Sequence, residues 1–469
     1  MKEGSVKETL EQYAAQKMLP MHMPGHKQNK NAAPDLAAFP LELDVTELPG
    51  LDDLHEPSGV LAQAMERAAA VWHSEKSYFL VNGSTCGILA GIRAATHRGD
   101  TVLVARNAHR SVFHAIELCG LRPVFMQPPL LREGCFGSLP PKAVEETLKK
   151  NSDARLVILT SPTYEGIISD VPTICKLGHR HGIPVLVDEA HGAHLDLHPA
   201  FPGGAVQGGA DLVVQSLHKT LPSLTQTAVL HRQGSRIDEK RLEHQLAVFE
   251  TSSPSYFFLL SMDGCVRNLQ PERLTPWAEA LAQFRREAGG WRHLRLMGKQ
   301  EEIFLQDPSK LVISTVGTDL TGYELSRQLT EENVQLELAT SAYALAMTGL
   351  GDTPATLERL SQALSLIDSR LRETTPSSPR SLYPCPVMVL PPEQALEVPF
   401  EMIAPKHAIG RISAEYLWAY PPGIPLVVPG ERIGTLPREG VRSTRGQYPE
   451  KIAVVVEKIH SVLDSRENL

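Results

Sequence analysis

Short apolar runs alternate with amphipathic stretches between residues 59 and 235, and this alternation is the dominant pattern of the chain. Most of the runs are apolar throughout, which is typical of strands buried on both faces of a sheet. The runs that predict strands are Ser77–Gly83, Thr101–Arg106, Pro123–Gln127, Arg155–Ser161, Ile183–Asp188, Asp211–Leu217 and Thr227–His231. Helical patterns between them include Gly87–Thr96, Lys142–Lys150 and Pro172–His181. This alternation predicts an α/β fold with a mostly parallel seven-stranded sheet and helices on both faces.

The regions on either side of this alternation have weaker patterns. A charged amphipathic helix is predicted over Met1–Gln16, and turns with little apolar content follow it. Helical patterns continue after residue 235, and three later runs are strand-like: Leu311–Thr315, Val334–Leu338 and Val387–Leu390. A Pro- and Ser-rich linker is predicted around Thr374–Pro379. We predict an N-terminal arm (1–58), a large domain with connecting helices (59–290) and a smaller α+β C-terminal domain (291–469).

Composition and charge narrow the possible partners. The chain has 469 residues and a net charge of −8, which gives no reason to expect nucleic-acid binding, because that requires a basic face. No apolar run approaches the roughly 20 residues of a membrane span, and the N-terminus lacks the apolar centre of a secretion signal. The six cysteines are scattered without a C-x-x-C pair, which is typical of reduced thiols. We therefore predict a cytoplasmic protein without a membrane partner.

Polar residues follow the ends of several predicted strands, which is where ligands bind in sheets of this kind. Ser84 and Thr85 come between the first strand and a helix, so their hydroxyls and backbone N–H groups could hold an anion. An ordinary helix cap would explain the same residues. Asp188 ends another strand, and a carboxylate buried there is costly unless a cation pairs with it. Capping of a loop is the structural alternative for Asp188.

Lys219 and His109 also follow predicted strands. Desolvation beyond a buried strand lowers the pKa of a lysine such as Lys219, and a neutral amine can form an imine. A lysine that extends to the surface is the ordinary alternative. An imidazole at the position of His109 can stack on an aromatic ring, although a single histidine is more often structural.

Together these features match pyridoxal 5′-phosphate, which has a phosphate, a pyridine nitrogen and an aldehyde. The anion site, the carboxylate and the lysine occur in that order on one sheet, and we predict that Lys219 carries this cofactor as a Schiff base. A metal centre made by His191, His194 and His198 is a competing hypothesis. Their spacing fits no motif that we can justify mechanically, and a metal would leave Lys219 unexplained, so no metal is predicted.

Several longer stretches between residues 21 and 425 carry a family resemblance. They are MHMPGHK, DVTELPGLDDLHEPSG, VNGSTCGILA, RNAHRSVFHA, SPTYEG, VDEAHGAH, SLHKTLPSLTQTA, ETSSPSY and YPPGIP. These stretches resemble the Orn/Lys/Arg decarboxylases, which are fold-type-I pyridoxal-phosphate enzymes of the aspartate-aminotransferase type. The resemblance is strongest to the short arginine decarboxylases of the Bacillus type, and SLHKT, SLTQTA and YPPGIP are its most specific parts.

The resemblance implies a role for the residues around the cofactor ring. Lys219 would bind the aldehyde, and Asp188 would keep the pyridine nitrogen protonated. His109 would stack on the ring, Ala190 would support its opposite face, and Thr163 would lie beside it.

The resemblance also implies how the phosphate is held and where a proton comes from. The expected phosphate ligands are Ser84, Thr85, Ser216 and His218. His191 would lie near the phenolic oxygen or the substrate, and either Lys219 or a histidine such as His191 would return a proton to the substrate carbon. The segment ETSSPSY would reach the phosphate of a neighbouring subunit, since active sites of the family form at a dimer interface.

The function implied is decarboxylation of a basic amino acid, with arginine giving agmatine for polyamine biosynthesis. Lysine or ornithine as substrate, an aminotransferase or aldolase on the same fold, and a non-catalytic cofactor-binding relative remain alternatives. A homodimer or higher homo-oligomer is expected. The substrate's distal cation needs a carboxylate, and the candidates are Asp44, Glu47, Asp52, Asp53, Glu56 and Glu415.

Overall fold

The structure is a computed structural model that describes residues 4–375, 386–419, 424–436, 441–444, 446–447 and 450–456. Cys385 and the first four residues of YPPGIP lie outside the described residues, as does the Pro-rich part of the predicted linker. Among the residues described, no helix is long and apolar enough to cross a bilayer.

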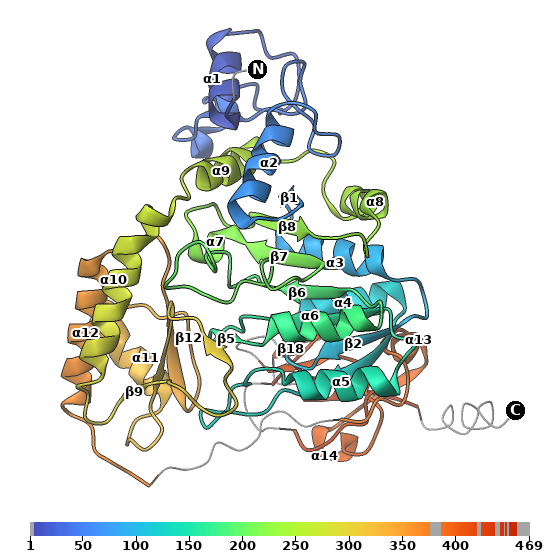
Figure 1. The fold of residues 1–469 in the computed structure, drawn as a ribbon, viewed down its shortest axis with the longest axis vertical. Helices are drawn as coiled ribbons and strands as arrows, with labels where there is room; N and C mark the ends of the chain where they lie inside the picture. Colours follow the sequence, from blue (N-terminus) through green and yellow to red (C-terminus); the bar gives the residue numbers. More distant parts are fainter. Residues whose placement is uncertain are drawn as a thin grey trace, which may run out of the picture.

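A seven-stranded sheet forms the centre of the molecule, and it confirms the α/β fold (Figure 1). Its strands lie in the order β1-β8-β7-β6-β4-β2-β3. Only β8 runs against its neighbours β1 and β7, and every other pairing is parallel. The bounds are β1 Lys76–Leu80, β2 Thr101–Ala105, β3 Arg122–Met126, β4 Leu156–Thr160, β6 Val185–Asp188, β7 Leu212–Ser216 and β8 Ala228–Arg232.

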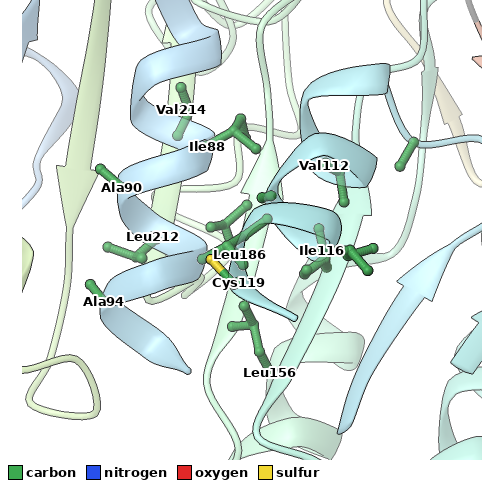
Figure 2. Packing of buried hydrophobic residues seen from close by; sticks show 14 of the residues in the cluster. Ile88, Ala90, Ala94, Val112, Ile116, Cys119, Leu156, Leu186, Leu212 and Val214 are labelled. Carbon is green, nitrogen blue, oxygen red and sulfur yellow. The ribbon is translucent and has the colours of Figure 1, made fainter. Parts of the chain in front are cut away.

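Both faces of the sheet are buried because alternate side chains of each strand contact different helices. On one face, Leu186, Leu212 and Val214 pack with side chains of α3 and α4, as Figure 2 shows. On the other face, Val187 and Val213 belong to the apolar cluster of α5 and α6. The helix bounds are α3 Gly83–Ala95, α4 Arg110–Cys119, α5 Pro141–Lys150, α6 Val171–Arg180 and α8 Glu239–Phe249.

The N-terminal arm has no core of its own, and its helix α1 packs on α2 and α9, beyond the edge strand β1 of the large sheet (Figure 1). Val6 and Leu10 of α1 join an apolar cluster with α2, α9 and the strand residues Phe79 and Val229. The bounds are α1 Val6–Ala15, α2 Val60–Trp72 and α9 Tyr256–Arg267.

The C-terminal region forms smaller sheets. One is antiparallel, in the order β12-β13-β11-β9, and packs against α10 and α12. Its elements are α10 Pro271–Ala288, β9 Arg295–Leu296, β11 Lys310–Ser314, α11 Gly322–Glu331, β12 Leu338–Ala339, β13 Tyr343–Met347 and α12 Pro354–Asp368. β5 (Ile167–Ile168) and β10 (Leu305–Gln306) pair between the two regions. The remaining elements are α13 Pro392–Glu397, β14 Phe400–Ile403, α14 Pro405–Ala408, β15 Leu417–Ala419, β16 Ile424–Val427, β17 Val441–Ser443, β18 Gly446–Gln447 and β19 Ile452–Val455.

Three predicted elements differ from the structure. The helix after the first strand begins at Gly83 and not at Gly87, because the Gly-Ser-Thr turn is itself the first turn of α3. The strand predicted over Val334–Leu338 was wrong except at its last residue, since residues 334–337 are irregular backbone between α11 and β12. Val387–Leu390 is also not a strand, because only Met388 makes an isolated bridge there, to Glu431.

Candidate active site

A cavity of about 690 Å³ lies where the parallel strands of the large sheet end. This is the edge at which α/β sheets bind ligands, because strand-to-helix loops converge there. Seven of the ten residues predicted to act in the site line this cavity: Ser84, His109, Thr163, Asp188, Ala190, His191 and Lys219.

Lys219 lies in α7 (Leu217–Thr220), a single helical turn that directly follows the buried strand β7. Its Nζ is 3.0 Å from Nε2 of His191, which follows β6. Burial lowers the pKa of Lys219, while Asp188 opposes this effect. Burial, together with the charge of Lys219, holds the pKa of His191 well below its usual range. The site therefore holds an amine with increased nucleophilic character against a neutral imidazole.

Asp188 ends β6 and is almost entirely buried. Its Oδ1 accepts a hydrogen bond from the backbone N–H of Ala190 at 3.1 Å. Burial raises the pKa of this carboxyl, and the charge of Lys219 counteracts it. A carboxylate in such a position is stabilised by a bound cation, which is what a protonated pyridine nitrogen provides.

His109 precedes α4 and is held by that helix. Its Nδ1 accepts from the backbone N–H of Ser111 at 3.3 Å and lies 2.9 Å from the Ser111 hydroxyl. Burial lowers the pKa of His109 to about 3, so the ring is neutral at ordinary pH. Because Nδ1 is an acceptor, the proton of this neutral ring is on Nε2. A neutral ring fixed in this way is suited to stacking.

The N-terminus of α3 borders the cavity. Gly83 has φ = +76°, a left-handed conformation that glycine adopts without strain, and it begins the helix. Asn82 precedes the helix but makes no capping bond with its side chain, whose Oδ1 accepts from Thr251 instead. The first N–H groups of α3 are therefore available to an anion. The hydroxyl of Ser216, at the end of β7, donates to Ser84 Oγ at 2.9 Å.

Three of the predicted residues do not line the cavity. Thr85 is exposed on the first turn of α3, and Ser216 meets the cavity only through Ser84. The ring of His218 is turned toward the β7–β8 connection, where its Nδ1 donates to the carbonyl of Thr227 at 2.9 Å.

The cavity also contains residues that the sequence did not single out. Three buried polar atoms there lack a partner among the described residues: Asn107 Oδ1, Thr160 Oγ1 and His191 Nδ1. Asn107 and Thr160 each lie at the end of a parallel strand, a signal that could have identified them. The ring of Tyr164 lies 4.4 Å from that of His191 and also borders the cavity.

None of the six acidic candidates for the substrate's distal cation lines the cavity. Asp52 accepts backbone hydrogen bonds at the start of α2, and Asp44 lies 3.1 Å from Nε2 of His26. Glu415 is buried, and its Oε1 accepts from the backbone N–H of Ala453 at 2.7 Å. The lining does include another carboxylate, Glu165.

The three histidines of the alternative metal hypothesis have different partners. His191 contacts Lys219, His194 lies 3.1 Å from Asp307, and Nδ1 of His198 accepts from the backbone N–H of Ala200. Within the part of the chain that the structure describes, no three His, Cys, Asp or Glu side chains are grouped as metal ligands.

Comparison with known proteins identifies the family. Residues 6–281 match the major domain of the Orn/Lys/Arg decarboxylases, and residues 383–442 match their C-terminal domain. The chain belongs to the Orn/Lys/Arg decarboxylase family. It is therefore a pyridoxal-phosphate-dependent decarboxylase of a basic amino acid, as the sequence motifs predicted.

Relatives of this decarboxylase align along most of its length. The uncharacterized protein YaaO of Bacillus subtilis is 36% identical over 90% of each chain. An arginine decarboxylase of Halalkalibacterium halodurans is 34% identical over 88% of this chain and 87% of the relative. The constitutive lysine decarboxylase of Escherichia coli superimposes with a TM-score of 0.80 at 20% identity, covering 96% of this chain and 81% of that structure. This last likeness confirms the fold.

The cavity of this decarboxylase fits its cofactor in three respects. The buried carboxyl of Asp188 needs a cation, the helix N-terminus beside Ser84 offers free N–H groups, and Lys219 offers an amine with a lowered pKa. These are the groups that a pyridine nitrogen, a phosphate and an aldehyde require.

Proposed function

We propose that this decarboxylase acts on arginine and releases agmatine and carbon dioxide. Arginine decarboxylases from three Bacillus species and from Halalkalibacterium halodurans are 31–34% identical over 88–90% of the chain, whereas the constitutive lysine decarboxylase of Escherichia coli is 25% identical. The observation that carries the catalytic part of the proposal is the 3.0 Å contact between Lys219 Nζ and His191 Nε2 inside the cavity.

Lys219 is proposed to hold the cofactor's aldehyde and His191 to exchange a proton with it. When bound, pyridoxal phosphate provides the electron sink for the pair left by the departing carbon dioxide. Their 3.0 Å contact gives a proton a direct path between the amine and the imidazole, and burial lowers the pKa of both groups. The Lys219–His191 pair is therefore the source of the proton that the substrate carbon receives.

Asp188 is proposed to pair with the pyridine nitrogen, and His109 to stack on the ring. Among the described residues, the carboxylate of Asp188 accepts a hydrogen bond from the N–H of Ala190, and burial raises its pKa while the charge of Lys219 nearby lowers it without a hydrogen bond between them. Ala190 and Thr163 line the same cavity and would contact the ring from its other face and its edge.

The phosphate is proposed to bind at the N-terminus of α3. The hydroxyls of Ser84 and Ser216 are 2.9 Å apart at this point, and Thr85 is on the same helical turn. Nδ1 of His218 is occupied by Thr227, which leaves its Nε2 as the ring atom available to a phosphate.

The assembly is proposed to be a homodimer or higher homo-oligomer with sites at the subunit interface, in the cytoplasm, supplying polyamine biosynthesis. The segment 250–256 supports a role near the phosphate, because Thr251 donates to Asn82 beside α3 of its own chain. The five described cysteines are unpaired, in keeping with a reducing compartment.

A product assay tests the proposal. Purified protein with pyridoxal phosphate is incubated with equal amounts of arginine, lysine and ornithine, and the amines are identified by mass spectrometry. We expect agmatine as the main product, and none from Lys219→Ala, which also lacks the visible absorbance of bound cofactor. Cadaverine or putrescine as the main product would reassign the substrate. A keto acid in place of an amine would favour an aminotransferase.

A further inference from the structure

A second group of titratable side chains lies behind the cavity and is fully buried. Lys310, Asp307 and His194 each have 0% exposure, and none of them lines the cavity. Lys310 is the first residue of β11, an internal strand of the C-terminal antiparallel sheet. Its side chain therefore extends from the C-terminal region toward the catalytic loops of the large sheet.

All three N–H bonds of the Lys310 ammonium have acceptors. Nζ donates to Asp307 Oδ2 at 2.8 Å, to Ser309 Oγ at 3.0 Å and to the backbone carbonyl of His191 at 3.1 Å. The other carboxylate oxygen of Asp307 lies 3.1 Å from His194 Nε2. Because an ammonium has three donors, this network satisfies Lys310 completely.

The network holds two cavity loops at once. Its bond to the carbonyl of His191 fixes the residue whose ring contacts Lys219. The backbone N–H of Asp307 also donates to the carbonyl of Gly166 at 2.8 Å, in the loop that carries Thr163. A Cβ at Gly166 would come within 2.8 Å of the Lys310 side chain, and Gly166 has φ = +84°, so only glycine fits there.

Stability alone does not explain a buried ion pair at this place. Replacing such a pair with apolar residues of similar volume is often neutral or stabilising, because burial of both charges costs as much as their attraction returns. The charge of Lys310 has an additional effect, since it acts with burial to lower the pKa values of Lys219 and His191. The other charged or titratable groups that influence these two residues are Asp188, Glu337, Asp307 and His109.

We infer that Lys310, held by Asp307, is a positioning residue that fixes His191 against Lys219 and disfavours an additional positive charge in the cavity. This inference rests on the proposed role of Lys219. Burial alone would raise the pKa of Asp307, but Lys310 and His194 hold it well below its usual range, so Asp307 stays ionised as the partner of Lys310.

The test compares holoenzyme of the wild type with Lys310→Met and with the double variant Asp307→Asn/Lys310→Met. The double variant removes both charges, so no unpaired charge is left buried and folding is preserved. The first readout is the pH midpoint of the visible absorbance of bound pyridoxal phosphate, without substrate. We expect the midpoint to rise by about one pH unit in Lys310→Met, because a nearby positive charge has been removed. The rise should be smaller in the double variant, because the loss of the opposing charge of Asp307 offsets part of it.

The second readout separates kcat from KM. We expect kcat to fall roughly 10- to 100-fold, because His191 loses its anchor, while KM changes less than about threefold. Arg285→Met is the matched control, since Arg285 donates to the carbonyls of Pro308 and Lys310 but has no contact with His191. This control should lower the melting temperature without moving the absorbance midpoint.

A double variant with both the midpoint and the kcat of the wild type would overturn the inference and make the network purely structural. A result that refutes the proposed function can be distinguished from this one. In that case the wild type itself would show no cofactor absorbance or no turnover of any basic amino acid, whereas the inference predicts a difference between the wild type and its variants.

Discussion

Two adjacent carboxyl groups at the end of β6 have different environments because successive side chains point to opposite sides. Asp188 lines the cavity, whereas Glu189 points into the protein. Glu189 accepts hydrogen bonds from Gln215 Nε2 at 2.7 Å and from the backbone N–H of Ala205 at 2.8 Å. Burial nevertheless raises the pKa of Glu189 to about 8, so this carboxyl is mostly protonated in the folded protein at neutral pH.

We expect Glu189→Gln to alter how stability depends on pH. The folded wild type binds a proton at Glu189 up to a pH near 8, whereas the unfolded chain releases it near 4.5. The wild type therefore loses stability as the pH rises between these values. Between pH 5 and pH 7, the free energy of unfolding measured by urea denaturation should fall by roughly 2 kcal/mol more for the wild type than for the variant. The exposed Glu279 offers a control, and Glu279→Gln should follow the wild type. If the free energy of unfolding changed with pH in the same way for the wild type and Glu189→Gln, the prediction would be contradicted.

At the scale of elements, α2 begins without a capping side chain of its own. Gly59 is its N-cap, and the carboxylate of Asp52 takes over that function from seven residues earlier in the chain. Asp52 accepts from the backbone N–H groups of Ser58, Gly59, Leu61 and Ala62 at 2.8–3.3 Å. This position satisfies the free N–H groups of the helix and joins the N-terminal arm to it.

We expect Asp52→Ala to lower the free energy of unfolding by about 2 kcal/mol, because several buried N–H groups lose a charged acceptor. The neighbouring Asp53 is a matched control, since among the described residues its carboxylate accepts a single hydrogen bond, from the N–H of His55. Asp53→Ala should change stability by less than about 0.5 kcal/mol. The melting temperatures of both variants are measured by thermal unfolding, and equal values would refute a capping role for Asp52.

At the scale of the whole molecule, the C-terminal segment is part of the main core. Tyr416, Trp418 and Val428 belong to the same apolar cluster as the strands of the large sheet. The connection is reinforced by Arg106, at the end of β2, which is buried and lies 3.0 Å from Glu431. Arg106 also donates to the carbonyl of Pro425 at 2.7 Å. The end of β2 and the C-terminal strands are thus held together by one buried cation.

Arg106→Met should destabilise the protein by about 3–5 kcal/mol, because it leaves the carboxylate of Glu431 buried without its partner. The double variant Arg106→Met/Glu431→Leu should recover much of that loss. A surface pair provides the comparison: Arg327→Met removes a contact to the exposed Glu331 and should cost about 1 kcal/mol or less. Calorimetry measures all three, and a single variant as stable as the wild type would contradict the prediction.

The sequence by itself determined the large sheet and the order in which the candidate cofactor-binding residues follow its strands. Strands buried on both faces must be apolar throughout, so all seven were visible as runs, and parallel strands bring their carboxyl ends to one edge whatever their separation along the chain. This is why Ser84, His109, Asp188 and Lys219 could be expected together. The same reasoning did not find β13, because Tyr343–Met347 is rich in helix-forming Ala, Leu and Met and becomes a strand through its pairing with β11. The limits of the three domains stay a prediction.

Only the tertiary structure decided which side chains meet across the loops. The contact of His191 with Lys219, and the bond from Lys310 to the carbonyl of His191, join residues 28 and 119 positions apart. Periodicity cannot predict such pairs, because they depend on how separate elements pack and on which donor meets which acceptor in the interior. For the same reason Asp52, a candidate for the substrate site from its sequence context, is a helix cap in the folded chain.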